Sequence, residues 1–285
     1  RALPLSPAPA VRCRRSVSGW TLRAKRAPAL RVDLRGVTPA ALAARSSAEV
    51  ERWPVGHGPA LVPLGEFFSV DARSDDALVF EADLSRFDRV GWLMESGRLH
   101  VEGDVGDYVG GGMRGGEIVV DGSALALAAC EMTGGLLTIA GHAGDFAAST
   151  LPGSMDGMRG GTLIVRGNAG ARFGDRMRRG TALVFGDAGD FLASRMVAGT
   201  IAIGGRAGAH VGYGMRRGSV VFAGAAPDVS TTFVPALAEA AVFWQLLARD
   251  LARHGGPWAT LPKRRIERQL GDLAAGGKGE LIVVA

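Results

Sequence analysis

Methionine recurs at a nearly constant spacing between residues 94 and 224. Seven of the chain's eight methionines begin a repeat of 19 residues, and only the repeat that begins at Met132 carries seven extra residues. The repeats begin at Met94, Met113, Met132, Met158, Met177, Met196 and Met215. A fixed period near 20 residues is typical of a solenoid, in which each repeat packs on the one before it.

Two columns of glycine divide each repeat. They stand three and nine places after the methionine, as Gly116 and Gly122 do, and the residues five and seven places after it are apolar, as Ile118 and Val120 are. Alternation over such a short segment predicts a strand that turns one apolar row inward. The glycines fit corners, where the chain takes a positive φ or passes close to its neighbour.

The second half of each repeat has small residues eleven places after the methionine and apolar residues fifteen places after it. This pattern predicts a second strand in each coil. Parallel strands of one sheet are nearly always connected right-handedly. We therefore expect an all-β fold, a right-handed parallel β-helix solenoid with 19-residue coils, flanked by small α/β caps at both ends.

The flanking segments differ in composition from the repeats. Thr38 followed by Pro39 predicts a short helix that ends near Arg45, and residues 236–253 show an amphipathic helical pattern that places Phe243 and Trp244 on its apolar side. The expected division is a disordered or non-native tail at 1–16, an N-terminal extension at 17–72, the right-handed β-helix at 73–224, and a C-terminal helical cap and docking extension at 225–285.

Charge and composition exclude several classes of protein. The formal net charge is +5, but residues 1–35 contribute +8, so the rest of the chain sums to −3 and gives no support for a nucleic-acid partner. No apolar run approaches the roughly 18 residues of a membrane span. Cys13 and Cys130 lack metal-ligand spacing. We expect a cytoplasmic chain that binds no metal.

Aspartates recur thirteen places after alternate methionines, at Asp107, Asp145 and Asp190. Alternate coils lie about 9.6 Å apart, near the upper limit for the two carboxylates of an inverting glycosidase. A carbohydrate-active β-helix enzyme that uses Asp145 and Asp190 is therefore one alternative. Aspartates in turns commonly bond nearby backbone amides, however, and the aromatic platforms of a sugar site are missing. We expect no catalytic residue in this chain.

Arginine follows the methionine in several repeats, at Arg114, Arg159, Arg178 and Arg216. Such a row is either a solvated edge that discourages aggregation or a strip that faces an anion, since guanidinium groups pair well with carboxylates. Arg178 and Arg216 are the candidates for binding a carboxylate-rich ligand.

An apolar column and one loop are the candidates for a partner interface. The residue six places after the methionine should face outward, yet it is apolar in several repeats, which predicts a cover formed by the chain's own termini or by another protein. The extra residues between Ala148 and Met158 should project as a contact loop. The candidate interface residues are Val119, Ile164, Leu183, Val221, Pro152 and Met155.

The turns GDVGDYVG (103–110), GHAGDFAA (141–148) and GDAGDFLA (186–193) resemble a β-helix module of two protein groups. One is the C-terminal domain of glutamate synthase. The other comprises the C subunit of formylmethanofuran dehydrogenase and that of its bacterial relative, the formyltransferase/hydrolase complex. The segments PLGEFFSV, LVFEADLSRFDRVGWLM and GDLAAGGKGEL resemble the second group.

This resemblance implies a non-catalytic scaffold subunit of a formyltransferase/hydrolase complex in one-carbon metabolism, from formaldehyde to formate. Its partners would be hydrolase and formyltransferase subunits. The complex would use methylofuran and tetrahydromethanopterin-type carriers, and we expect this chain itself to bind no cofactor. A second hypothesis is that the arginine row steers or holds the acidic tail of a methylofuran-type carrier between subunits. The alternatives are the C subunit of an archaeal-type formylmethanofuran dehydrogenase and a regulatory β-helix like that of glutamate synthase.

Overall fold

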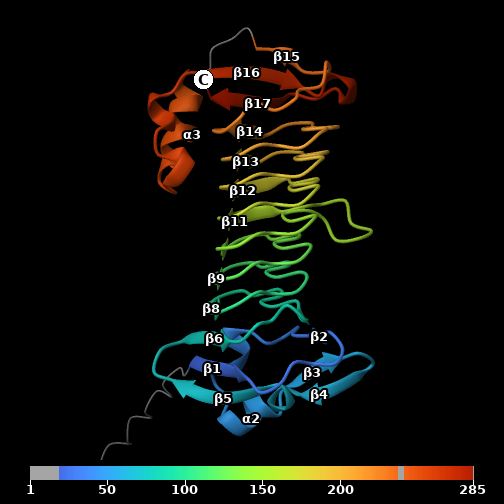
Figure 1. Ribbon diagram of the computed structural model, residues 1–285, viewed down its shortest axis with the longest axis vertical. Coiled ribbons are helices and arrows are strands. Elements are labelled where there is room, and N and C mark those ends of the chain that lie inside the picture. Colours follow the sequence, from blue (N-terminus) through green and yellow to red (C-terminus); the bar gives the residue numbers. More distant parts are fainter. Residues whose placement is uncertain (1–18, 237–240, 285) are drawn as a thin grey trace, which may run out of the picture.

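The structure is a computed structural model and describes residues 19–236 and 241–284. Stacked turns of the chain form a column, and a separate unit closes each end of it (Figure 1). The N-terminal residues form the lower unit and the C-terminal residues the upper one. The tail expected at residues 1–16 lies outside the described residues.

Short strands dominate the chain. The strands are β1 (Gly19–Ala24), β2 (Val32–Asp33), β3 (Pro54–His57), β4 (Ala60–Pro63), β5 (Phe68–Arg73), β6 (Ala77–Glu81), β7 (Phe87–Asp88), β8 (Arg98–Val101), β9 (Glu117–Val120), β10 (Leu136–Ile139), β11 (Arg159–Val165), β12 (Arg179–Val184), β13 (Thr200–Ile203), β14 (Ser219–Phe222), β15 (Val234–Pro235), β16 (Ile266–Gly271) and β17 (Gly279–Val284). The α-helices are α1 (Pro39–Leu42), α2 (Ser47–Glu51) and α3 (Ala241–Ala252), and the 3₁₀ helices are η1 (Leu64–Glu66), η2 (Gly256–Trp258), η3 (Leu261–Lys263) and η4 (Leu273–Ala275).

Strands β6 and β8 to β14 stack in parallel within one 13-stranded sheet. Their register joins equivalent residues, so that Leu99 pairs with Ile118, and Ile118 with Leu137. The mostly β fold expected from the alternating pattern is therefore confirmed. The second strand expected in each coil is reduced to a single bridge, as between Ala124 and Ala143. The backbone around the bridge is in turns, which still bond the next coil, as the N–H of Tyr108 does to the carbonyl of Ala126, but do not form a continuous strand ladder.

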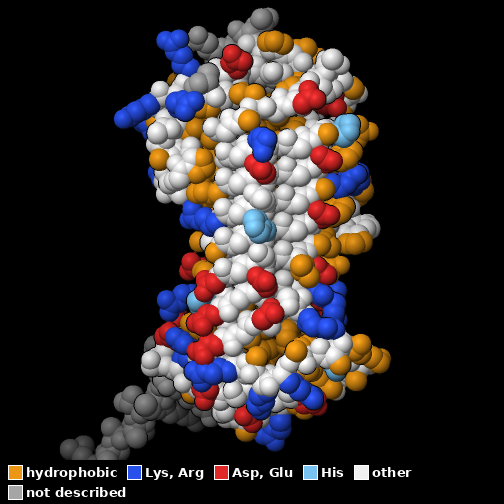
Figure 2. Space-filling model, viewed as in Figure 1, with side chains coloured by type: hydrophobic (Ala, Val, Ile, Leu, Met, Phe, Trp, Pro, Cys, Tyr) orange, Lys and Arg blue, Asp and Glu red, His pale blue; other side chains and the backbone are white. Residues whose placement is uncertain are grey.

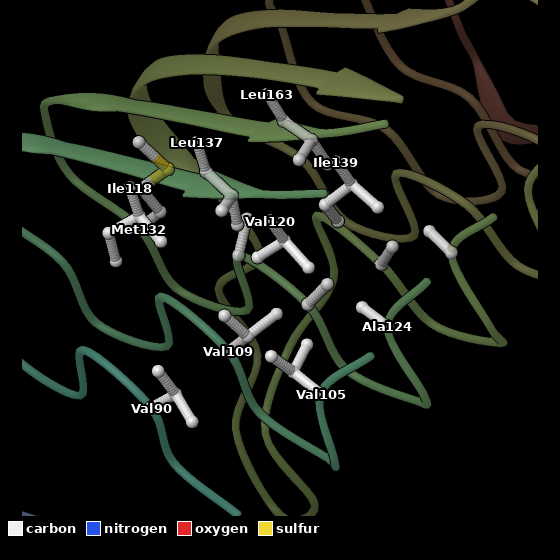
Figure 3. Packing of buried hydrophobic residues seen from close by; sticks show 14 of the residues in the cluster. Val90, Val105, Val109, Ile118, Val120, Ala124, Met132, Leu137, Ile139 and Leu163 are labelled. Atoms are coloured by element: carbon white, nitrogen blue, oxygen red, sulfur yellow. The ribbon is translucent and has the colours of Figure 1, made fainter. Parts of the chain in front are cut away.

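The interior of the column is packed with the residues that the repeat predicted. Ile118, Val120, Leu137 and Ile139 are completely buried, and side chains of successive coils point toward one another (Figure 3). All seven repeat-starting methionines are buried as well. This continuous core explains why one coil alone is not a stable unit, since its apolar row is covered only by its neighbours.

The lower end of the column is closed by the N-terminal residues. Strand β1 pairs in parallel with β6 and antiparallel with β5, so β6 has no open edge. The helix expected after Thr38 is present as α1, although it ends at Leu42 rather than near Arg45. Thr38 caps it by accepting from the backbone N–H of Ala41, and Trp20 donates its indole N–H to the carbonyl of Leu42.

The upper end is closed by the C-terminal residues. Strand β17 pairs in parallel with β14, and β16 then covers β17 in the antiparallel direction. The segment around Arg265 leads into strand β16, because Ile266 to Gly271 pair along the whole of β17. The division of the chain into four segments stays a prediction.

Helix α3 lies against the side of the upper coils (Figure 1). Its Trp244, Ala248 and Leu251 are buried, whereas Phe243, which was expected on the inner side, is 42% exposed. Residues 237–240, which belong to the predicted start of this helix, lie outside the described part of the chain. The buried cluster contains Ile164, Leu183, Ala202, Val221, Trp244, Ala248, Leu251, Trp258, Leu261, Ile282 and Val284.

Candidate functional site

Arginines from successive coils line an open groove of about 600 Å³. The lining residues are Asp156, Arg159, Arg178, Arg179, Val197, Ala198, Arg216 and Arg217. The predicted candidates Arg178 and Arg216 thus lie in one groove, which we call the arginine groove. Neighbouring coils are about 4.8 Å apart, and the row of cationic groups is interrupted at one coil, which contributes Val197 and Ala198.

The loop between Ala148 and Met158 projects from the column and reaches this groove (Figure 1). Its Asp156 forms an ion pair with Arg178, with 2.5 Å between Nε of Arg178 and Oδ1 of Asp156. Met155 is 67% exposed, and its sulfur is in contact with the guanidinium of Arg176. The loop is therefore folded back on the coil above it.

The groove has an excess of positive charge. It contains five arginines and one aspartate. Arg159, Arg179, Arg216 and Arg217 are exposed, and no carboxylate of the described residues pairs with them. Guanidinium groups form paired hydrogen bonds with carboxylates, so a ligand that carries several carboxylates fits this groove chemically.

A smaller pocket of about 330 Å³ lies in the N-terminal unit beside Arg31, Asp33, Arg35 and Asp88. Its charges are matched internally, since Arg31 bonds Asp88 and Arg35 bonds Asp33. The hydrogen bond that Arg31 donates to the Asp88 carboxylate raises the pKa of Arg31 above its ordinary value. Because these charges neutralise one another, the pocket holds less unpaired charge than the arginine groove.

The aspartate column serves the backbone. Asp107, Asp145 and Asp190 each accept the backbone N–H of the equivalent residue on the next coil, at 2.9, 2.7 and 2.8 Å. A second column does the same, for example where Nδ1 of His142 accepts from the N–H of Asn168 at 2.9 Å. These aspartates therefore accept hydrogen bonds from backbone amides in the turns, as the sequence predicted.

The apolar outer column is divided into two parts. Ile164, Leu183 and Val221 are buried under helix α3 and the residues that follow it. For these three residues the chain's own C-terminal segment provides the cover, so the expectation that they meet a partner requires a correction. Val119, on a lower coil, is partly exposed and is not in that cluster. Pro152 and Met155 are exposed on the loop.

A further column of large side chains lies fourteen places after the methionine. It contains Tyr108, Leu127, Phe146, Arg172, Phe191 and His210, together with Arg89, which takes the equivalent place on the coil before Met94; we call these seven residues the stacked edge. The predicted site residues do not include any of them. Their regular spacing and their chemistry, mostly aromatic or arginine in a turn, were the signal that could have revealed them.

The described residues contain no group of three or more His, Cys, Asp or Glu side chains that could hold a metal ion. None of the helices within those same ranges is long and apolar enough to cross a membrane.

Comparison with known proteins gives matches of two kinds. The family described as the GXGXG motif matches residues 87–242, more than half of the chain. The C subunit of the formyltransferase/hydrolase complex Fhc of Methylorubrum extorquens is 44% identical over 76 residues, which are 27% of this chain and 29% of that protein. The C subunit of the tungsten-containing formylmethanofuran dehydrogenase 2 of Methanothermobacter marburgensis is 36% identical over 96 residues, 32% of this chain and 36% of that one. The chain thus spans about a third of the length of these curated relatives.

A solved structure is similar over nearly the whole chain. It is the crystal structure of the formyltransferase/hydrolase complex FhcABCD from Methylorubrum extorquens in complex with methylofuran. One of its chains is 42% identical, with a TM-score of 0.87, and the match covers 93% of this chain and 99% of that one. The chain therefore belongs to the GXGXG motif family and is a homologue of the C subunit of the formyltransferase/hydrolase complex.

Proposed function

We propose that this chain is a non-catalytic scaffold subunit of a formyltransferase/hydrolase complex, which uses methylofuran and tetrahydromethanopterin-type carriers in the oxidation of formaldehyde to formate. The observation that carries the proposal is the 42% identity and TM-score of 0.87 to a chain of the FhcABCD complex over 93% of this chain. The hydrogen bonds that engage Asp145 and Asp190 with the backbone also support it, since they count against a polysaccharide-cleaving site.

The bacterial complex is preferred over the archaeal dehydrogenase. The identity to the bacterial C subunit is 44%, compared with 35 or 36% to the archaeal ones. The same matches, together with the similarity over the flanking units, favour this assignment over a regulatory module like that of glutamate synthase.

Co-expression tests this proposal. The chain, tagged at one end, is produced together with the hydrolase and formyltransferase subunits encoded in the same genome, and the purified material is identified by mass spectrometry. We expect a hetero-oligomer with formyltransferase and hydrolase activity, and no activity from the isolated chain. Purification of the chain without either partner would contradict the proposal, as would polysaccharide cleavage by the chain alone.

The arginine groove supports a second role within this complex, in which Arg178 and Arg216 hold the acidic tail of a methylofuran-type carrier. The solved relative binds methylofuran as a complex. In an assembled complex, the double variant Arg178→Glu and Arg216→Glu should raise the apparent KM for the carrier several-fold. Arg206→Glu is the control, because Arg206 is exposed and lies outside the groove. An unchanged KM in the double variant would refute this role.

We also propose that the coils wind as a right-handed parallel β-helix, since connections between parallel strands strongly prefer that hand. A crystal structure of the chain checks the handedness. The domain boundaries at residues 72 and 224 and a cytoplasmic location are proposals as well. Limited proteolysis tests the first and cell fractionation the second.

A further inference from the structure

The stacked edge is built against the conformational preference of its residues. All seven residues from Arg89 to His210 have a φ between 58° and 66°, and none is glycine. A left-handed conformation costs a non-glycine residue roughly 1–2 kcal/mol, a cost that glycine would avoid. Large side chains at this column must therefore make contacts that offset it.

Part of the compensation is stacking along the edge. The guanidinium carbon of Arg172 lies 4.5 Å from the ring centre of Phe191 and 5.9 Å from that of Phe146. The rings of Phe191 and His210 are stacked with centres 4.7 Å apart, and Tyr213 meets Phe191 edge-on. Arg172 is thus held between two aromatic rings on adjacent coils.

The two arginines of the edge differ in one respect. Arg89 also contacts aromatic rings, and it forms an ion pair with Asp33 at 3.1 Å. Arg172 has no carboxylate partner among the described residues. With its two faces covered by rings, the guanidinium has its N–H donors in the remaining plane, the geometry that suits a bidentate carboxylate.

Exposed apolar side chains occur along the column outside its strands. Within the coils, the exposed large apolar residues are Leu93, Leu125, Phe146, Met155 and Tyr213, and Phe146 is one of the two rings beside Arg172. Figure 2 shows hydrophobic, basic and acidic side chains along the right-hand edge of the column, on the side from which the loop projects in Figure 1. Aromatic residues and arginine carry much of the binding energy in protein interfaces.

We propose that the stacked edge docks a partner subunit of the complex, and that Arg172 binds an aspartate or glutamate side chain at the centre of that interface. This inference rests on the proposed function, because a sister subunit is the partner. Charge complementarity argues for this occupant, since the Arg172 guanidinium lies beside two aromatic rings and forms no ion pair with a carboxylate of the described residues.

The experiment measures assembly of the full chain with its sister subunits. Arg172→Glu should raise the dissociation constant about 30-fold or more, as expected for an arginine at the centre of an interface. Arg172→Lys keeps the positive charge but loses the paired N–H donors of the guanidinium. It should weaken binding less than Arg172→Glu does. The control Arg206→Glu, on an exposed turn of another face, should leave binding unchanged. Circular dichroism of each variant verifies that it is folded.

A second measurement uses the unmodified chain. Hydrogen exchange followed by mass spectrometry should show protection of the turns at residues 146–150, 172–176 and 191–195 on assembly. An assembled complex that is insensitive to Arg172→Glu, or that leaves these turns unprotected, would overturn this inference while leaving the proposed function intact. Failure of the unmodified chain to assemble would overturn both. Binding of an oligothymidylate that is lost in Arg172→Glu would overturn this inference in favour of a nucleic-acid ligand.

Discussion

At the scale of single residues, the spacing of methionine and glycine has a direct physical cause. A Cβ on Gly135 would lie 2.7 Å from Cε of Met113 and 2.8 Å from the backbone oxygen of Gly116, and the φ of Gly135 is +88°. Gly116, Gly161, Gly180, Gly199 and Gly218 meet the methionine of the preceding coil in the same way, whereas Gly97, in the first repeat, meets Pro39. Each methionine therefore packs its terminal methyl group on a glycine of the following coil, and neither residue can change without affecting the other.

Gly135→Ala should lower the free energy of unfolding by about 2 kcal/mol or more, because it adds a steric clash to an unfavourable φ. Gly153→Ala is the matched control. Gly153 has a φ of +84°, but nothing lies within 4 Å of its added Cβ. That variant should lose only about 1 kcal/mol. Urea unfolding measures both, and equal losses would show that the contact with Met113 has no energetic role.

Cys130 should be unreactive in the folded chain. It is completely buried, and burial raises its pKa to about 12. In a Cys13→Ser background, iodoacetamide at pH 8 should modify Cys130 only after unfolding. Because the folded-state pKa lies above the ordinary value of 9.0, the free energy of unfolding should also fall as the pH rises from about 9 toward 12. Rapid alkylation of the native chain would contradict this prediction.

At the scale of elements, helix α3 has two faces of different importance. Trp244 is 4% exposed and packs in the cluster with Leu183 and Val221, whereas Leu246 on the outer face is 64% exposed. The amphipathic pattern predicted the helix and the inward position of Trp244. It placed Phe243 wrongly, because a helical pattern fixes the direction of its apolar face only to within about one residue.

Trp244→Ala should therefore destabilise the chain by about 3 kcal/mol or more, as large-to-small changes in a core do. Leu246→Ala, on the same helix, should change stability by less than about 0.5 kcal/mol. Thermal unfolding compares the two. A small effect of Trp244→Ala would show that α3 contributes little to the cover of the upper coils.

The aspartate column can be tested in the same way. Asp145→Ala removes the acceptor of the backbone N–H of Ala171 and should cost about 1 kcal/mol. Asp145→Asn keeps an oxygen acceptor in the same place and should be nearly neutral. Urea unfolding distinguishes the variants. Equal losses in the two variants would show that the negative charge of Asp145, which both variants remove, matters more than the hydrogen bond, which only the alanine variant loses.

The sequence predicted the features that depend on local patterns, namely the strands of the repeat and the helices α1 and α3, but not the contacts between side chains of different coils. Leu99, Ile118 and Leu137 were placed correctly because alternation in a short strand leaves one choice of face. The sequence pattern could not predict which segment buries Leu183, since an apolar outer position can be covered either by the chain's own terminus or by a partner. The role of Arg172 depends on rings from two other coils, and such contacts become visible only when the coils are stacked.

At the scale of the whole molecule, the stack should tolerate a change in the number of its coils. Deletion of residues 113–131 removes one repeat and joins Gly112 to Met132, so that every later residue keeps its place in the pattern. This variant should fold and unfold cooperatively with reduced stability, because a solenoid is held by contacts between neighbours. Deletion of residues 113–122 shifts the pattern and should prevent folding. Circular dichroism and size-exclusion chromatography measure both outcomes.

The strands that close the two ends give the column a defined length. Strand β17 occupies the place of a next coil above β14, and β16 then covers it, so the sheet does not continue upward from β14 to another copy of the chain. The distance between the two end units is consequently fixed in steps of about 4.8 Å, one per coil. Insertion or loss of whole repeats is therefore the way in which the separation of the two end units, and of the surfaces that they carry, can change.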